Sequence, residues 1–182
     1  MERADAARNR RRILAAAAEL LATRGVESLT MDEVAAAAGV GVGTVYRRFT
    51  DRGFLAQALL DDQEREFQAA FLSGPPPLGP GAPPAERLRA FVHAFVDRLE
   101  TQAAVLVVAE TAAPDARLVT GAYALHRTHL AGLLRQLRPD DDTWFLADAV
   151  LAPLAAAQFQ HQRAAGMSAE RIKTGFDQLL QV

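Results

Sequence analysis

Residues 30–49, with the sequence TMDEVAAAAGVGVGTVYRRF, decide how the amino-terminal part of the chain folds. Thr30 and Glu33 form a capping box, in which the hydroxyl accepts from the third helical amide and the carboxylate reaches back to the cap. Gly39 is a typical residue for the end of the helix that begins there. Between these signals, apolar residues recur at the spacing of one buried helical face: Met31, Val34, Ala35 and Ala38.

A second short helix is expected from about Val42 to Phe49, with Val45 and Phe49 as its buried anchors one turn apart. Helices this short are not stable alone, so both must pack on a preceding helix, expected from about residue 5 to residue 24. Two short helices joined by a tight turn with glycine have the spacing of a helix-turn-helix, whose second helix enters the DNA major groove. With Val45 and Phe49 in the core, Thr44 and Arg47 fall on the exposed face.

The rest of the chain is also expected to be helical, because alanine and leucine dominate and no stretch alternates with a period of two. The Val-Leu-Val-Val run at 105–108 leaves a strand open as an alternative there. Residues 73–84 hold six prolines and three glycines, which predicts a linker or ordered loop. Helices are expected from 50 or 51 to about 72, around the apolar stripe 88–99, and over 103–113, 116–138, 143–165 with a kink at Pro153, and 168–180.

Composition excludes several classes of protein. The 182 residues contain no cysteine, which rules out disulfide scaffolds, cysteine-ligated zinc, iron–sulfur clusters and thiol catalysis. No apolar run approaches the ~20 residues that span a bilayer, so neither a membrane protein nor a membrane partner is expected. A basic stretch at 8–12 before an apolar one resembles a signal peptide, but Glu19 interrupts it. We therefore expect a cytoplasmic protein.

The charges differ between two expected domains, residues 1–53 and residues 54–182, which the helix from residue 54 to 72 links. The first has nine arginines against seven acidic residues, and the second has eleven basic against fifteen acidic residues. This asymmetry suits a polyanion-binding module on an acidic body. An enzyme is not expected: His126 and His129 have a spacing compatible with a metal, but no zinc motif, phosphate loop or nucleophile elbow completes it. No metal or cofactor is predicted.

Residues 12–60 resemble the DNA-binding domain of the TetR family of bacterial transcriptional regulators. The matching residues are ordered along this segment: Ile13–Ala17, Glu19–Ala22, Gly25, Leu29–Ala35, Ala38–Phe49 and Leu55. The resemblance implies an all-α protein of about nine helices, with an amino-terminal helix-turn-helix and a carboxy-terminal domain for ligand binding and dimerisation. It implies a repressor that binds a palindromic operator in double-stranded DNA and is released by a small-molecule effector of unknown identity.

The same resemblance implies a DNA-binding set of eight residues, of which seven have contact roles and the eighth is Gly41. Thr30, Tyr46 and Arg52 would contact phosphates, whereas four residues would face base edges or the adjacent backbone: Val42, Gly43, Thr44 and Arg47. Gly41 stands where the family usually has a polar N-cap, so the face is poor in hydrogen-bond donors and suits contact with thymine methyl groups. Packing of Tyr46 on the first helix is the alternative for that residue.

A dimer is expected because one helix-turn-helix reads only a few base pairs. We place its interface on the last two helices, in residues that permit close approach or anchor the contact: Ala149, Ala152, Ala155, Ala156, Phe159, Phe176 and Leu179. The alternative is that the alanines fill the core of one subunit. The alternative function is a dimeric helical module that binds small molecules or proteins and does not bind DNA.

The effector pocket predicted in the carboxy-terminal domain is aromatic, which suggests an apolar or planar molecule. Its candidate residues are Phe67, Phe71, Phe91, Phe95, Glu110, Tyr123, His126, Trp144 and Gln158, with His129 as a further polar candidate. Each aromatic residue could instead be ordinary core.

Overall fold

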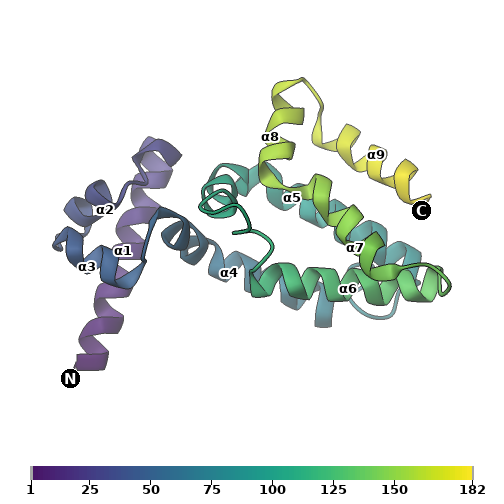
Figure 1. Ribbon diagram of the computed structural model, residues 1–182, viewed down its shortest axis with the longest axis horizontal. Helices are drawn as coiled ribbons and strands as arrows, with labels where there is room; N and C mark the ends of the chain where they lie inside the picture. The colour runs from purple at the N-terminus through teal and green to yellow at the C-terminus, as the bar shows by residue number, and fades with distance from the viewer. Residues whose placement is uncertain (1, 182) are drawn as a thin grey trace.

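The computed structural model describes residues 2–181, with side chains from residue 7 onward, and every regular element in this range is helical, as expected. The elements are α1 (Glu2–Arg24), η1 (Val26–Ser28), α2 (Met31–Ala38), α3 (Val42–Arg48), α4 (Arg52–Ser73), α5 (Pro84–Glu110), α6 (Gly121–Leu137), α7 (Thr143–Leu151), η2 (Ala152–Leu154), α8 (Ala156–Ala164) and α9 (Ala169–Leu180). Helices α1–α3 form one end of the molecule, and α4 leads from them into the body that α5–α9 build (Figure 1). In the described range no helix is long and apolar enough to cross a membrane.

Two apolar cores divide the molecule, and α4 belongs to both. Its first half adds Leu55, Ala56 and Leu60 to the core of α1–α3. Its second half adds Phe67 and Phe71 to the core of the body. The division expected at residue 53 therefore remains a prediction, because one rigid helix crosses it.

The capping signals of the helix-turn-helix form as expected. The Thr30 hydroxyl accepts from the Glu33 amide at 3.2 Å, and it donates to the Glu33 carboxylate at 3.1 Å. Gly39 ends α2 with φ 61°, in the left-handed region that glycine adopts without strain. The local sequence thus determines both ends of α2.

Two expected helix boundaries are wrong in the middle of the chain. Helix α5 runs unbroken to Glu110, because Ala103 and Val105 continue the buried face of the apolar stripe, so there is neither a separate helix at 103–113 nor a strand. Helix α6 begins at Gly121 and not near residue 116, since Thr120 caps it by accepting from the Tyr123 amide at 3.1 Å.

Pro153 breaks the expected helix over 143–165 and does not merely kink it. Proline lacks the amide hydrogen that an α-helix needs in its interior. The chain leaves α7 at Leu151, passes through η2, adopts an extended conformation at Ala155 and starts α8 at Ala156. The expected long helix is thus three short elements.

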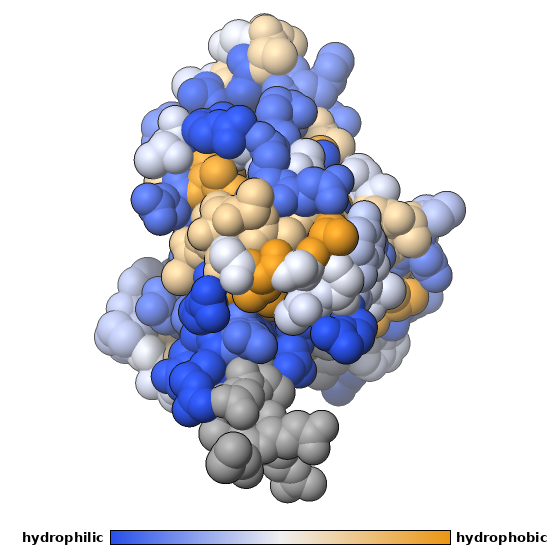
Figure 2. Space-filling view, turned by 90° about the vertical axis from the view of Figure 1, so that its left-hand side faces the viewer, coloured by the Kyte–Doolittle hydropathy of each residue, from blue (hydrophilic) through white to orange (hydrophobic). Residues whose placement is uncertain are grey.

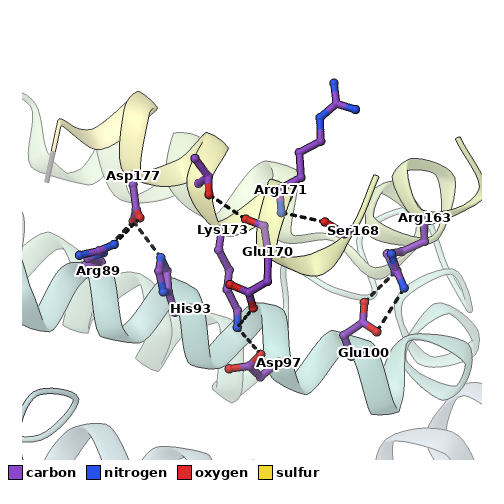
Figure 3. Close-up of polar contacts among 11 residues, drawn as sticks. Arg89, His93, Asp97, Glu100, Arg163, Ser168, Glu170, Arg171, Lys173 and Asp177 are labelled. Carbon is purple, nitrogen blue, oxygen red and sulfur yellow. Dashed lines mark hydrogen bonds and ion pairs between the residues drawn. The ribbon is translucent and has the colours of Figure 1, made fainter. Parts of the chain in front are cut away.

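Polar contacts hold α8 and α9 on α5 (Figure 3). Asp177 of α9 accepts from Arg89 Nη2 at 2.7 Å and contacts His93 Nε2 at 2.8 Å. Nearer the start of α9, Lys173 Nζ lies 2.6 Å from Asp97 Oδ1. The apolar counterpart of these contacts is Ile172 and Phe176, which α9 buries.

Candidate nucleic-acid interface and internal cavity

Helix α3 presents one side to the core and the other to solvent. Val45 is fully buried and Phe49 nearly so, whereas Val42 is 41% exposed and Tyr46 is 50% exposed. The exposure of Tyr46 argues against the alternative that it packs on α1. Figure 2 shows this end of the molecule, where an apolar area lies between hydrophilic side chains.

The glycines of α3 leave its exposed side open. No atom lies within 4 Å of a Cβ built at Gly41 or Gly43. Close approach of another helix therefore does not account for them, and an incoming backbone or base edge has room there. Arg47 Nη2 donates to Thr44 Oγ1 at 3.2 Å on the same exposed surface, so the two predicted base-facing side chains lie together.

Arg52 makes a contact within the domain, and its predicted phosphate contact stays a prediction. Its Nη2 donates to the Val26 carbonyl at 2.6 Å, and its Nε is buried without a hydrogen-bond partner in the described part of the chain. The guanidinium thus joins the start of α4 to η1. The phosphate role of Thr30 stays a prediction, since its hydroxyl is engaged in the helix cap.

Gly53, next to Arg52, lies where the amino-terminal domain meets the end of α5. A Cβ built at Gly53 would overlap the Cβ of Ala112. Glycine is therefore required by the close approach of α4 to the turn after α5. Asp51 caps α4 by accepting from the Phe54 amide at 3.0 Å, so the helix begins firmly despite the glycine.

A cavity of about 410 Å³ lies in the body between α4, α5, α6 and the turn before α6. Four of the predicted pocket residues line it: Phe95, Glu110, Tyr123 and His126. Other predicted residues are wrong as direct lining. Phe67, Phe71 and Phe91 pack in the core around the His126 ring, at centroid distances of 5.5, 5.8 and 5.7 Å.

Trp144 and Gln158 are also outside the cavity lining. Trp144 lies on the surface, where the Arg127 guanidinium stacks 4.7 Å from its ring centroid. Gln158 is exposed on α8. The predicted aromatic pocket is thus a cavity with many polar groups, backed by an aromatic core.

Glu64 is the centre of a buried charge cluster that the sequence analysis missed. It accepts from Gln68 at 2.7 Å and from Arg98 Nη1, and His126 Nε2 lies 2.9 Å from its Oε1 without the alignment of a regular hydrogen bond. Burial alone would raise the pKa of Glu64, but the contacts with His126, Arg98 and Gln68 outweigh it and lower the pKa to about 2. The carboxylate is ionised throughout the physiological range.

A sequence signal for this cluster exists. Glu64 precedes Phe67 and Phe71 by three and seven residues, and Arg98 follows Phe95 and Phe91 by three and seven residues. Both charges therefore share the inward face of their helices with phenylalanines. Charged residues in register with an apolar stripe indicate a buried polar cluster.

Glu110 links the cavity to the break before α8. It accepts from the Ala156 amide at 2.8 Å, and Arg117 Nε lies 3.3 Å from its other oxygen. Burial raises the pKa of Glu110 against the opposing effects of these two partners. Arg117 also donates to the Leu151 carbonyl at 2.7 Å, so the wall of the cavity is tied to the end of α7.

His129 is not among the cavity-lining residues, and its ring packs on Phe71 at a centroid distance of 4.5 Å. Burial, with the nearby charges of Arg87 and His126, lowers the pKa of His129 to about 4. The imidazole is thus neutral near pH 7. The rings of His126 and His129, three residues apart on α6, both pack against the phenylalanines of this cluster.

The residues predicted for a dimer interface fall into two groups. Ala156, Phe159 and Phe176 are buried in the core of the body, so their assignment to an interface is wrong. Ala149 and Ala152 are exposed on α7 and η2, Ala155 is half-buried, and Leu179 is 63% exposed on α9. These four residues remain available at the surface, and their place in a dimer interface stays a prediction.

Comparison with known proteins identifies the amino-terminal domain. The family described as bacterial regulatory proteins, tetR family, matches residues 13–59, from the buried face of α1 into α4. Residues 13–59 are therefore similar to the DNA-binding domain of TetR-family regulators. A Staphylococcus aureus protein (strain bovine RF122 / ET3-1), the HTH-type transcriptional regulator SAB2452, is 43% identical over 69 residues, which are 38% of this chain and 37% of that protein.

A second curated relative matches a similarly short part of the chain. The regulator SAUSA300_2515 of Staphylococcus aureus (strain USA300) is 43% identical over 53 residues, 29% of either chain. The matches thus span 37% and 29% of these two curated relatives, which are named as transcriptional regulators.

Solved structures extend the likeness in fold to the body. The fatty acid degradation regulator FadR from Bacillus halodurans has a TM-score of 0.65 and 18% identity, over 93% of this chain and 96% of that chain. A TetR-family transcriptional regulator from Rhodococcus sp. has a TM-score of 0.62 and 20% identity, over 95% and 96% of the two chains. At such identities the likeness concerns the fold alone.

Proposed function

We propose that this chain is a ligand-responsive transcriptional regulator of the TetR family, a repressor that binds a palindromic operator in double-stranded DNA as a homodimer. The observation that carries the proposal is the orientation of α3, which buries Val45, exposes Tyr46 and Arg47, and leaves Thr44 half-buried. Side chains on such an exposed face reach base edges and phosphates when a recognition helix enters the major groove. The regulator acts in the cytoplasm and performs no enzymatic reaction.

A homodimer supplies the second reading head. Two heads separated by about one helical turn of DNA, ~34 Å, read a palindrome. Phe145, Ala149 and Ala152 recur at i, i+4 and i+7 from the start of α7, and the large apolar Phe145 is 66% exposed. Together with Leu179 on α9 they offer an apolar surface to a second copy.

The effector binds in the cavity between α4, α5 and α6. Helix α4 supports this role because it lines the cavity through Leu60 and Glu64 and packs through Leu55 and Ala56 in the core of α1–α3. A ligand that favours one position of α4 shifts the population toward one spacing of the two heads, provided that its affinities for the two conformations differ.

Selection of bound sequences from a random DNA pool tests the proposal with the full chain. We expect a palindrome whose half-sites lie about one turn apart, and no enrichment with the double variant Tyr46→Ala and Arg47→Ala. Enrichment of no sequence by a folded dimer would overturn the proposal and favour a helical module that binds small molecules or proteins without DNA.

A further inference from the structure

The inner wall of the cavity holds cationic groups with unused hydrogen-bond donors. Arg98 donates through Nε to Gln102 and through Nη1 to Glu64, while its Nη2 has no acceptor in the described part of the chain. Nη2 is not among the atoms sealed from solvent, and Arg98 lines the cavity. This donor is therefore open to a ligand.

Arg117, in the turn before α6, contributes a second such donor. Its Nε faces Glu110 and its Nη2 donates to the Leu151 carbonyl, which leaves Nη1 without an acceptor in the same range of residues. The guanidinium lies 5.2 Å from the ring centroid of Tyr123. His126 also lines the cavity, but its Nε2 is buried and lies 2.9 Å from Glu64 Oε1, so it offers no open donor.

The buried carboxylates, by contrast, are already engaged. Both oxygens of Glu64 have partners, from Gln68 and His126 on one side and Arg98 on the other. Both oxygens of Glu110 are occupied as well, by the Ala156 amide and Arg117. A cationic ligand would have to displace these partners, whereas an anion finds free donors.

Apolar side chains also line the cavity: Leu60, Phe95, Leu106 and Leu125. The other polar side chains of the lining are Gln57, Asp61, Arg65, Gln68 and Thr120, and Asp61 is paired with Arg10 and Arg65. A volume of about 410 Å³ lies toward the lower end of the roughly 300–1,000 Å³ typical of small-molecule pockets. Arginine pairs with carboxylates through charge-assisted hydrogen bonds that are stronger than neutral ones.

We propose that the effector is a small organic carboxylate with a compact apolar body, bound by the free donors of Arg98 and Arg117. This inference rests on the function proposed above and names the chemical class of the ligand. The carboxylate lies between the two arginines, and the apolar body packs on Phe95 and the neighbouring leucines.

Matched probes that differ only in charge test the inference. Benzoate, benzamide and benzylamine form one set, and hexanoate, hexanamide and hexylamine form another. Calorimetric titration into the full-length dimer should show that each anion binds at least tenfold more tightly than its amide or amine. Equal affinities within both sets, tighter binding of the amines, or no binding of either anion would overturn it.

Variants assign the binding to the two arginines. Arg98→Gln and Arg117→Gln should each weaken binding of the preferred anion at least tenfold, and Arg117→Lys should restore part of it because lysine retains the charge. Arg135→Gln, on the exposed end of α6 outside the cavity, is the matched control and should bind as the parent does. If Arg98→Gln fails to fold, the Arg117 pair decides: equal anion affinity in Arg117→Gln and the parent overturns the assignment.

The operator distinguishes the two proposals. Fluorescence anisotropy of labelled operator DNA measures the affinity of the protein for the operator directly, with no carboxylate, amide or amine present. A chain that binds its operator but shows no preference for anions overturns only the ligand class. A chain that binds no operator overturns the proposed function, whatever its cavity holds.

Discussion

Arg47 and Arg52 lie five residues apart, but Arg47 is exposed, whereas Arg52 is half-buried and bonded to η1. Arg47 contacts only Thr44 among the described side chains, while Arg52 donates to the Val26 carbonyl. Arg47→Ala and Tyr46→Ala should each weaken operator binding by about 1–3 kcal/mol with little change in the melting temperature. Anisotropy titrations and thermal melts measure the two effects.

Arg52→Ala is the contrasting variant. Loss of a charge-assisted hydrogen bond to the half-buried Val26 carbonyl should lower the free energy of unfolding by about 1–3 kcal/mol. Undiminished stability of Arg52→Ala, together with weaker DNA binding, would return Arg52 to the phosphate contact that the family resemblance implied.

His129 makes stability depend on pH in a defined window. Its folded-state pKa of about 4 lies below the ordinary value of 6.5, so the unfolded chain binds the proton more tightly. The contribution of His129 to the free energy of unfolding is therefore fully present above pH 6.5 and is lost as the pH drops from 6.5 toward 4. Chemical unfolding between pH 5 and 7 should show this decline, and His129→Leu should flatten it.

Glu64 provides an internal reference for that experiment. Its folded-state pKa of about 2 lies below the ordinary 4.5, so its contribution is complete above pH 4.5 and is lost only as the pH falls toward 2. An undiminished slope between pH 5 and 7 in His129→Leu would contradict the assignment to His129, because Glu64 does not titrate there.

At the scale of single elements, the sequence predicts best where the signal is local. The cap at Thr30 and the end at Gly39 depend on residues three to nine positions apart, and both form as expected. The continuity of α5 could not be predicted in the same way, because Ala103 and Val105 are buried by contacts with distant segments.

The same contrast between local and long-range signals applies to the two candidate sites. The exposed face of α3 follows from helical periodicity once Val45 is assigned to the core. The polar cavity depends on pairs such as Glu64 with Arg98, which are 34 residues apart in the sequence. Only the tertiary packing of α4 against α5 brings such charges together, and an aromatic stripe by itself indicates core.

The junction of α4 with the end of α5 depends on one glycine. Gly53→Ala should lower the free energy of unfolding by about 1–3 kcal/mol, because the added methyl group overlaps Ala112 and one of the two segments must shift. Combining it with Ala112→Gly should recover much of the loss. Denaturant titrations of the two single variants and the double variant measure this coupling.

Gly132→Ala in the interior of α6 is the matched control. No atom lies within 4 Å of a Cβ built there, so helix propensity should dominate and raise stability by up to about 1 kcal/mol. If Gly53→Ala behaved like Gly132→Ala, the close approach of α4 to the turn after α5 would not constrain the chain.

For the whole molecule, symmetry connects the surface of the body to DNA recognition. The described subunit exposes Phe145, Ala149 and Ala152 along one line and Leu179 on α9. Burial of such a surface in a twofold contact would fix the distance between the two α3 helices. We thus propose that this face affects operator binding only by setting the distance between the two α3 helices.

Ala152→Glu and Leu179→Glu should separate the two copies, because each places a charge in the middle of an apolar contact. Light scattering at micromolar concentration should then report a monomer, and affinity for the full palindrome should fall at least tenfold while the fold of α1–α3 is retained. Leu72→Glu, an equally drastic change at an exposed leucine on α4, should leave the dimer and the affinity intact. If both glutamate variants remain dimers that bind the palindrome as the parent does, the two copies meet through another surface, and the spacing of the reading heads must be set elsewhere.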